Sequence, residues 1–426
     1  MTKTLPFSKQ QAESWQECYG TPIYVYDLEG IKKTVLDVQR AFSWNKGFCE
    51  CFAVKATPTP AIIRLLAQLG CGTDCASVSE LVISQASGLS GKKIMFTSNQ
   101  TSDLAYQSAV KAGAIINLDD ITQIKRLEKA VKIPDFVCLR YNPGKFSIGT
   151  SDIMGHLTDS KFGMTKEQLL NAYCILKEKG VKHFGLHCMA ASCCLDNNYY
   201  PALAQMLFRL VVEIHENLGI DIELVDLGGG IGIPYRPEEK PVDIIEVGSL
   251  VKKVYDKVLA PKGLDVAIYT EMGRFITGPN GYLVTGVRGF KRIYKDYVGV
   301  DATACDLIRP AMYGAYHHIS VLGKESPCDK DVPMRKVDVC GGLCENNDKF
   351  AVDRLLPEVE YGDLLVIHDA GAHGRAMGYN YNGMPRCGEL LLDKNGDVKL
   401  IRRAESLDDL FATFDVDGEF DYEKYL

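Results

Sequence analysis

Lys55 is the residue of this chain whose surroundings most clearly suggest chemistry. It stands near the end of residues 51–57, whose β-branched and aromatic composition predicts a buried strand. The helix breakers of residues 57–60 follow, so we expect its side chain at a half-desolvated mouth. Desolvation disfavours the ammonium form, and a neutral amine can attack a carbonyl to form a Schiff base. The alternative is a lysine that extends its amine into solvent from a strand end.

Three consecutive glycines are suited to binding a phosphate. Gly228, Gly229 and Gly230 follow the apolar run 222–227. Without Cβ atoms, such a loop lets backbone N–H groups curl around an anion. The spacing does not fit the dinucleotide-binding fingerprint, and a tight turn after a strand is the alternative.

Glu271 and Arg274 follow the next apolar run, residues 266–270, with Gly273 between them. A carboxylate beside a pyridine nitrogen would keep that ring protonated and make it an electron sink. The guanidinium offers a bidentate clamp for phosphate or carboxylate. An ordinary ion pair at a strand end is the alternative.

Two further segments carry candidate groups. His187 lies in the run 183–190 and could stack on a flat cofactor, although a hydrogen-bonded core histidine is the common alternative. The polar loop 340–348 places Cys344 beside Glu345, a thiol proton donor next to a group that binds a cationic amine.

Other polar groups follow later in the chain. Arg309 is a second candidate carboxylate clamp, with the phenol of Tyr313 nearby. His373, Tyr379 and Tyr381 add further polar side chains.

The elements that must position these residues alternate along the first two thirds of the chain. Short apolar runs alternate with longer amphipathic stretches, which favours a parallel (β/α)8 barrel with its chemistry at the carboxyl ends of the strands. The predicted strands are residues 51–57, 73–77, 93–98, 115–119, 136–142, 183–190, 222–227 and 266–270.

The sequence pattern changes after residue 280. Short runs typical of β-strands occur there without long helices between them, which predicts antiparallel β structure. An early strand at 22–26 is expected to join this part. We therefore expect a barrel domain over residues 36–280 and a β-domain made of residues 1–35 and 281–426.

Bulk composition narrows the functional classes. The chain has 426 residues and a net charge of −7, which argues against binding to nucleic acid or anionic membranes as its main role. No apolar run is long enough to cross a bilayer. The fifteen cysteines are scattered, an arrangement that suits reduced thiols in the cytoplasm, and they lack the Cys-x-x-Cys pairs of structural zinc sites.

Taken in order, these motifs resemble the fold-type III pyridoxal-phosphate-dependent decarboxylases, and within them the diaminopimelate decarboxylases. The resemblance rests on residues 53–56, 228–230, 271–274, 344–345 and 379–382 and covers nearly the whole chain. It implies an alanine racemase-like fold, with a TIM-like barrel and a C-terminal antiparallel β-domain. It also implies a homodimer with shared active sites, because the Cys344 loop of this family reaches into the neighbouring subunit's site.

The resemblance also implies the cofactor and the residue roles. Pyridoxal 5'-phosphate would be bound covalently by Lys55, with Cys344 as the proton donor. The implied cofactor contacts are His187, Gly228, Gly229, Gly230, Glu271, Gly273, Arg274, His373 and Tyr381. The implied substrate contacts are Arg274, Arg309, Tyr313 and Glu345.

Three departures from the family pattern stand out. The chain has Ala190 where the family has a phosphate-binding serine, so that contact is missing or comes from Ser192. Met272 replaces a proline, and His373 replaces a tyrosine that Tyr379 or Tyr381 would have to supply.

The resemblance implies decarboxylation of meso-2,6-diaminopimelate to L-lysine, the last step of lysine biosynthesis. Only a substrate with a distal amino-acid group would use both Arg309 and Glu345. The alternative is a related decarboxylase acting on a basic amino acid or on carboxynorspermidine.

Overall fold

The computed structural model describes residues 3–146, 157–324, 333–414 and 422. It divides the chain into two compact units. The first comprises Asp27–Gly281 and Asp369–Ala376, with Lys3 and Thr4, and the second contains the described parts of Leu5–Tyr26, Tyr282–His368 and Met377–Leu426.

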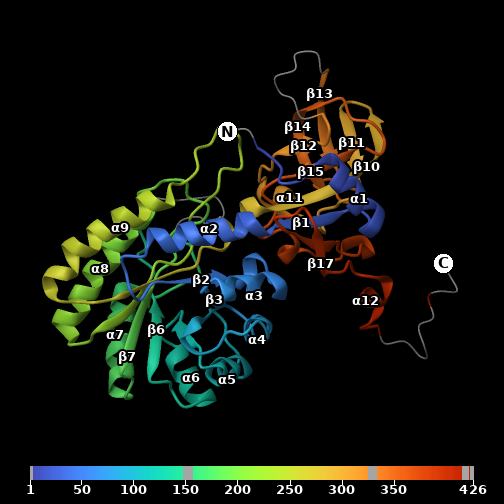
Figure 1. Ribbon diagram of the computed structural model, residues 1–426. Coiled ribbons are helices and arrows are strands. Elements are labelled where there is room, and N and C mark those ends of the chain that lie inside the picture. The colour runs from blue at the N-terminus through green and yellow to red at the C-terminus, as the bar shows by residue number, and fades with distance from the viewer. Residues whose placement is uncertain (1–2, 147–156, 325–332, 415–421, 423–426) are drawn as a thin grey trace. The chain divides into compact units, whose positions relative to one another are not determined.

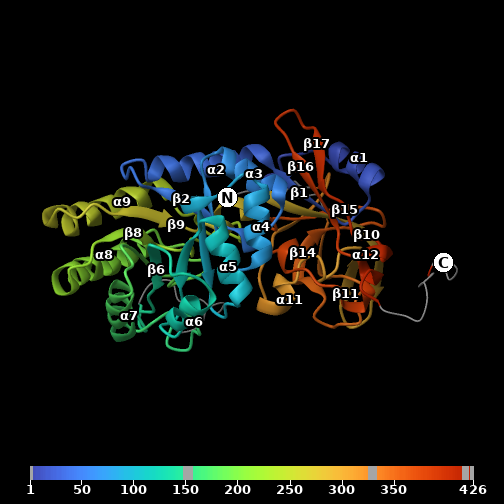
Figure 2. The same cartoon turned by 90° about the horizontal axis from the view of Figure 1, so that it is seen from below.

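Eight parallel strands of the first unit close into a barrel, which confirms the predicted (β/α)8 fold. Helices α7, α8 and α9 lie along the outside of the strands in Figure 1, and Figure 2 shows the same layers from below. The strands are β2 (Cys49–Ala53), β3 (Gly72–Cys75), β4 (Ile94–Ser98), β5 (Ile115–Leu118), β6 (Phe136–Arg140), β7 (His183–His187), β8 (Ile222–Asp226) and β9 (Ala267–Thr270).

A helix follows each strand, as the alternating sequence pattern requires. These are α3 (Pro60–Gln68), α4 (Val78–Ala86), α5 (Asp103–Ala112), α6 (Gln123–Ala130), α7 (Lys166–Glu178), α8 (Tyr199–Leu218), α9 (Ile244–Val258) and α10 (Gly273–Thr277), and α2 (Leu28–Ala41) precedes the barrel.

Local signals fix where these helices begin. The Asp27 carboxylate accepts a hydrogen bond from Glu29 N at the start of α2, and the Ser77 hydroxyl accepts one from Glu80 N at the start of α4. Thr165 and Gln168 form a reciprocal capping box at the start of α7.

The expected domain boundary at residue 36 falls inside helix α2, but the whole of α2 lies in the first unit. There α2 packs against α9: a Cβ on Gly248 of α9 would collide with Ala41 O at the end of α2, so the two backbones approach closely.

The second unit is built on a sheet with the order β14-β13-β11-β10-β1-β16-β17, and β15 pairs with β10 and β12. The predicted early strand β1 lies between β10 and β16, inside this sheet. The predicted antiparallel pairing is found in most strand pairs, such as β10–β11 and β13–β14, whereas the β11–β13 pair is parallel. The strands are β1 (Ile23–Asp27), β10 (Gly281–Arg292), β11 (Asp296–Val300), β12 (Ile319–Val321), β13 (Met334–Cys340), β14 (Lys349–Pro357), β15 (Leu364–Ile367), β16 (Gly388–Leu392) and β17 (Val398–Arg402).

Among its described residues, the second unit also has the short helices α1 (Lys9–Tyr19), α11 (Arg309–Tyr313) and α12 (Leu407–Phe411). Its core is an apolar cluster in which Trp15 of α1 packs with Val25 of β1, Val284 of β10 and Leu390 of β16.

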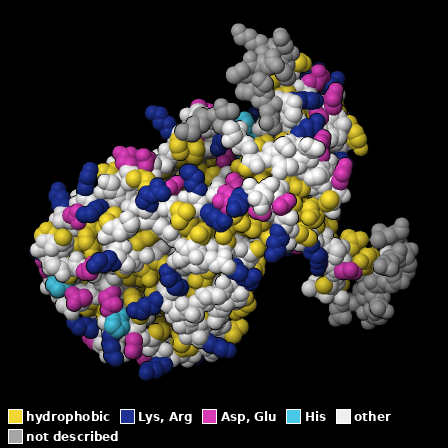
Figure 3. All heavy atoms as spheres, in the orientation of Figure 1, with side chains coloured by type: hydrophobic (Ala, Val, Ile, Leu, Met, Phe, Trp, Pro, Cys, Tyr) yellow, Lys and Arg dark blue, Asp and Glu magenta, His cyan; other side chains and the backbone are white. Residues whose placement is uncertain are grey.

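One face of the described residues is mixed in charge, and their helices are not of the membrane-spanning kind. Basic and acidic side chains are interspersed on the face seen in Figure 3, without an extended basic surface among the residues coloured there. No helix in the described ranges is long and apolar enough to cross a membrane.

Candidate active site

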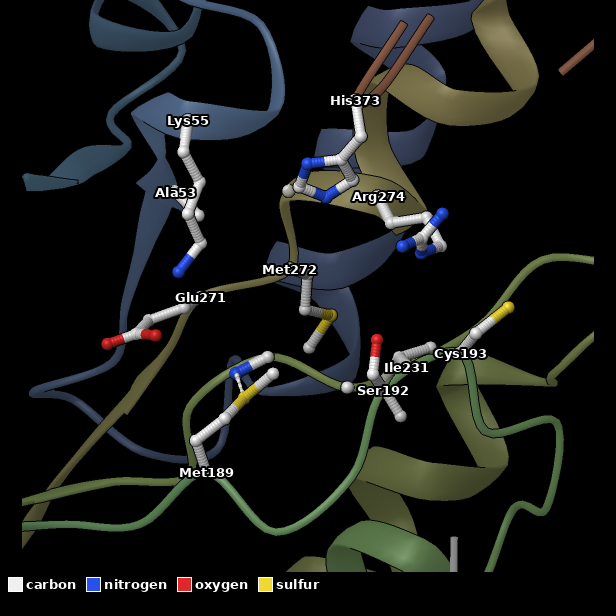
Figure 4. A pocket seen from close by; sticks show the side chains of 13 residues that line it. Ala53, Lys55, Met189, Ser192, Cys193, Ile231, Glu271, Met272, Arg274 and His373 are labelled. Atoms are coloured by element: carbon white, nitrogen blue, oxygen red, sulfur yellow. Dashed lines mark hydrogen bonds between the residues drawn. The ribbon is translucent and has the colours of Figure 1, made fainter. Parts of the chain in front are cut away.

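A small pocket lies at the carboxyl ends of the barrel strands. Its walls come from the turns that follow β2, β7, β8 and β9 and from the segment Asp369–Ala376, all within the first unit. In the close view of Figure 4, Lys55, Ser192, Glu271, Arg274 and His373 surround one space. The strand-end location predicted from the sequence is therefore where the cavity lies.

Lys55 stands on a short 3₁₀ turn, Val54–Ala56, and not within a strand extending to residue 57 as the sequence suggested. Strand β2 ends at Ala53 because the next residues turn, with Thr57 N donating to Val54 O at 3.0 Å. The Lys55 side chain is exposed to the open pocket, so the expected half-desolvation is also corrected. Its amine points toward the Glu271 carboxylate in Figure 4.

The three glycines form a cradle that other residues could not form. Gly228 and Gly230 have φ of +61° and +98°, which disfavour any residue with a Cβ. A Cβ on Gly229 would lie 2.6 Å from Glu271 O. The Gly229 N–H meets only a weak acceptor, Met189 Sδ at 3.2 Å, as the dashed line in Figure 4 marks. Backbone N–H groups placed in this way fit an anionic group.

A buried polar cluster lies beneath the pocket. Ligand-type atoms of His187, Asp226 and Glu271 all lie within 4.8 Å of one another. His187 Nε2 lies 3.5 Å from Glu271 Oε1, and neither atom has a hydrogen-bond partner within the described part of the chain. His187 Nδ1 lies 2.9 Å from Asn117 Nδ2, which fixes the plane of the ring. Unsatisfied buried polar atoms of this kind mark a place where a ligand supplies the missing partner.

Burial and like charges control the protonation of this cluster. The pKa of Glu271 is raised well above its ordinary value by burial and by the nearby carboxylates of Asp74 and Asp226. Burial, followed by the positive charges of Arg140 and Lys55, holds the pKa of His187 well below its ordinary value. Glu271 therefore tends to carry a proton in the cofactor-free protein, and His187 is neutral.

Asp226→Asn is expected to flatten the pH dependence of stability of the cofactor-free protein. Burial raises the Asp226 pKa from 3.8 to about 7. Between these values the folded state holds a proton that the unfolded state releases, so stability is present at low pH and falls as pH rises toward 7. The amide of the variant would keep an acceptor for Gly228 N, now 2.8 Å from Asp226 Oδ1, but could not titrate.

The apparent melting temperature, measured at pH 5 and pH 8 for both proteins, checks this prediction. The variant should lose less stability than the wild type between the two pH values. Equal losses would show that Asp226 does not hold the proton.

Arg274 and His373 complete the rim of the pocket. Arg274 Nη1 donates to Tyr235 Oη at 2.5 Å, and its guanidinium lies 5.9 Å from the centre of that ring. His373 adopts a φ of +55°, and its N–H donates to Ala56 O at 2.9 Å, next to Lys55. Ser192 also lines the pocket, which is the position from which it could replace the serine that the family pattern has at residue 190.

The other predicted residues lie in the second unit. Arg309 and Tyr313 belong to α11, where Arg309 is buried and its Nη1 lies 2.9 Å from His317 Nε2, while Tyr313 is exposed. Tyr381 is exposed as well.

Cys344 and Glu345 stand on an exposed loop whose backbone is nevertheless anchored. Buried Asp348 accepts from Leu343 N at 2.8 Å and from Ala304 N at 2.7 Å, and Cys344 N donates to Asn382 Oδ1 at 2.8 Å. The thiol and the carboxylate are thus presented outward from a fixed loop.

Several site residues carried no distinctive sequence signal. Asn117 and Tyr235 are recognisable only through their contacts with His187 and Arg274. Asp226 lies two residues before the glycine cradle, a position that could have marked it.

Residues 28–278, more than half of the chain, match the family model described as pyridoxal-dependent decarboxylase, pyridoxal binding domain. The chain belongs to the pyridoxal-dependent decarboxylases. Its glycine cradle, Lys55 and the unsatisfied Glu271–His187 pair fit the phosphate, the aldehyde and the ring of that cofactor. Pyridoxal phosphate is accordingly the cofactor of this decarboxylase.

Named relatives extend the match over nearly the full length. Protein TabA of Pseudomonas amygdali pv. tabaci is 40% identical over 394 residues, covering 92% of this chain and 90% of TabA. The diaminopimelate decarboxylase of Methanothermobacter thermautotrophicus is 36% identical, with 92% and 91% covered. The crystal structure of Methanocaldococcus jannaschii diaminopimelate decarboxylase with L-lysine superimposes with a TM-score of 0.87 at 33% identity, covering 95% of this chain and 94% of the other.

Proposed function

We propose that this decarboxylase converts meso-2,6-diaminopimelate to L-lysine and carbon dioxide. The observation that carries the proposal is the match, over nine tenths of the chain, to relatives named diaminopimelate decarboxylase at 30–36% identity. A cytoplasmic location is part of the proposal, because free thiols such as Cys49 and Cys51 suit a reducing compartment.

The barrel residues would hold the cofactor. Lys55 would bind its aldehyde carbon through Nζ, while Gly228, Gly229, Gly230, Gly273 and Arg274 would surround its phosphate. His187 would lie against its ring, and Glu271 would face the ring nitrogen. When bound, pyridoxal phosphate supplies an electron sink for the pair left by the departing carbon dioxide.

The protein's own task in the reaction is to manage protons and charge. Burial and the neighbouring carboxylates raise the pKa of Glu271, which favours a protonated carboxyl that can share its proton with a basic nitrogen. Neutral His187 adds no competing positive charge beside it. Cys344 Sγ would deliver a proton to the α-carbon after carbon dioxide has left.

Substrate selection would depend on the second unit. Arg309 would bind the distal carboxylate of the substrate and Glu345 its distal ammonium, with Arg274 and Tyr313 as further contacts. His373 stands where the family pattern has a tyrosine, and His373 itself, Tyr379 or Tyr381 would make the contact of that tyrosine. Since ornithine and lysine lack the distal carboxylate, Arg309 would discriminate against them.

The active site is proposed to be shared between two chains of a homodimer. Cys344 and Glu345 are exposed on an anchored loop, so they are available to a neighbouring subunit. In a C2 dimer, each chain would give this loop to its partner and receive the same loop in return.

The substrate assignment is tested by comparing kcat/KM for meso-diaminopimelate, carboxynorspermidine, ornithine and lysine. We expect diaminopimelate to be preferred by about two orders of magnitude, because a binding site built for a polar group rejects an analogue that lacks it. If ornithine were turned over as efficiently as diaminopimelate, the alternative of a basic amino-acid decarboxylase would be favoured. A preference for carboxynorspermidine would favour the alternative of a carboxynorspermidine decarboxylase.

Arg309→Lys is expected to raise KM for diaminopimelate by about tenfold or more, since lysine cannot form the bidentate pair with a carboxylate. Steady-state kinetics with the wild type alongside provides the measurement. Arg288→Lys, which alters an exposed arginine paired with Asp301 on the same unit, is the matched control and should leave KM unchanged. An unchanged KM in the Arg309 variant would remove Arg309 from the substrate site.

A further inference from the structure

Glu50 is a buried carboxylate at the seam where the barrel closes. It lies on β2, is 2% exposed, and pairs in register with Thr270 of β9. Its Oε2 accepts from Thr270 Oγ1 at 2.5 Å, and its Oε1 accepts from Met272 N at 2.7 Å. One side chain thus binds the residues on both sides of Glu271.

The backbone of Glu271 is held from other directions as well. Glu271 N donates to Gly228 O at 2.8 Å, and Gly273 N donates to Glu271 O at 2.9 Å. These bonds link Glu271 to the glycine cradle and to α10. The two bonds to Glu50 add a link to the strand that leads, five residues after Glu50, to Lys55.

The seam itself is short. Strands β2 and β9 share two registered residue pairs, whereas β6 and β7 share five. Burying a carboxylate is unfavourable unless hydrogen bonds compensate it, and burial indeed raises the pKa of Glu50 well above its ordinary value. An apolar residue could occupy this position with a smaller desolvation penalty. The two hydrogen bonds to Thr270 and Met272 therefore explain why a carboxylate is found here.

We infer that Glu50 is a positioning residue for Glu271: by binding Thr270 and Met272 it sets how the Glu271 carboxylate enters the cofactor pocket. The inference rests on the proposed role of Glu271 at the cofactor and requires no particular substrate. If the enzyme failed to decarboxylate diaminopimelate, the inference about Glu50 would still hold.

Residue 272 decides whether one of these bonds exists. Met272 has a φ of −79°, a value that proline also adopts, but proline has no N–H to donate. Met272→Pro would therefore delete the bond to Glu50 Oε1 while leaving this backbone angle accessible.

The chain contains a matched control for Glu50 shortly before the same strand. Asn45 is 7% exposed, its Nδ2 donates to Val266 O at 2.9 Å, and its Oδ1 accepts from Ile268 N at 3.1 Å. Asn45 therefore binds the start of β9 with two hydrogen bonds, as Glu50 binds the end, but its partners are not neighbours of Glu271 in the chain.

The test compares Glu50→Ala and Asn45→Ala as holoenzymes without substrate, with Glu271→Gln as the reference. The absorption band of the bound cofactor and the cofactor dissociation constant are measured. We expect Glu50→Ala to shift the band in the direction seen for Glu271→Gln and to raise the dissociation constant about tenfold, a loss of the size found when a residue that orients a metal ligand is removed. Asn45→Ala should lower the melting temperature and leave both cofactor properties within about twofold of the wild type.

Further variants keep the inference open to refutation if Glu50→Ala does not fold. Glu50→Gln can still accept from Met272 N and interact with Thr270 Oγ1, so it should keep the wild-type band. Met272→Pro should shift the band in the wild type and add little in the Glu50→Leu background, where the acceptor is already gone and an apolar side chain fills the space.

The inference is overturned if Glu50→Ala and Asn45→Ala change the cofactor properties alike, or if neither changes them. It is equally overturned if Glu50→Gln behaves like Glu271→Gln, because charge and not positioning would then be responsible. Fully additive effects of Met272→Pro and Glu50→Leu would also contradict it.

Discussion

Replacing Lys55 with alanine is expected to remove both the covalent cofactor and the activity. Lys55 is the lysine that lines the pocket, together with Gly229 and Gly230, and its amine points toward Glu271. Without its amine the cofactor has no covalent attachment there, and we expect kcat to fall on the order of 10³-fold or more, as for other covalent catalytic residues. The Schiff-base absorption band should disappear at the same time.

Borohydride reduction followed by peptide mass analysis gives the direct measurement. The wild type should carry the reduced cofactor on the peptide that contains Lys55, and the Lys55→Ala protein should carry none. Lys111→Ala, which alters a surface lysine of α5, is the control and should behave as wild type. A reducible adduct that persists in Lys55→Ala would refute the assignment.

Mixing two inactive variants is expected to restore activity. Lys55→Ala and Cys344→Ala homodimers should each be nearly inactive, because one lacks the lysine that binds the cofactor and the other lacks the proton donor. If each site takes Lys55 from one chain and Cys344 from the other, a mixed dimer contains one intact site. With random exchange about half of the dimers are mixed, so activity should approach roughly a quarter of wild type.

The control mixes Lys55→Ala with the Lys55→Ala,Cys344→Ala double variant, which cannot form an intact site in any combination. Native mass analysis should verify that mixed dimers are present. If they are present and activity stays at the level of the single variants, the two residues act within one chain and the shared-site proposal is wrong.

The barrel could be predicted because its signal is local and repeated. Each parallel strand is a short, almost continuously buried run, such as β2 or β5, and each is followed by an amphipathic helix. The carboxyl ends of such strands meet at one end of the barrel, so Lys55, His187, the glycines and Glu271 could be assigned to one region from order alone.

Features that depend on pairing over long distances in the chain could not be predicted. The bonds of Glu50 to Thr270 and Met272 join residues 220 and 222 positions apart. In sequence Glu50 is only a polar residue next to the predicted strand 51–57. The segment Asp369–Ala376, which carries His373 and belongs to the first unit, lies within sequence of β-domain character.

Local backbone conformation also could not be predicted. The sequence pattern predicts Lys55 in a strand, yet the chain turns at Val54, because the segment up to Pro60 leads into the next helix. The parallel β11–β13 pair likewise depends on a long connection whose course the apolar pattern does not encode.

Isotope labelling of the substrate follows the proposed reaction itself. The purified holoenzyme is incubated with meso-diaminopimelate labelled with ¹³C in both carboxyl groups, and the released carbon dioxide and the amino-acid product are quantified by mass spectrometry. We expect one labelled carbon dioxide for each lysine formed, with one label retained in the lysine and neither product formed by Lys55→Ala. A holoenzyme that binds pyridoxal phosphate but yields no lysine and no carbon dioxide would contradict the proposed function.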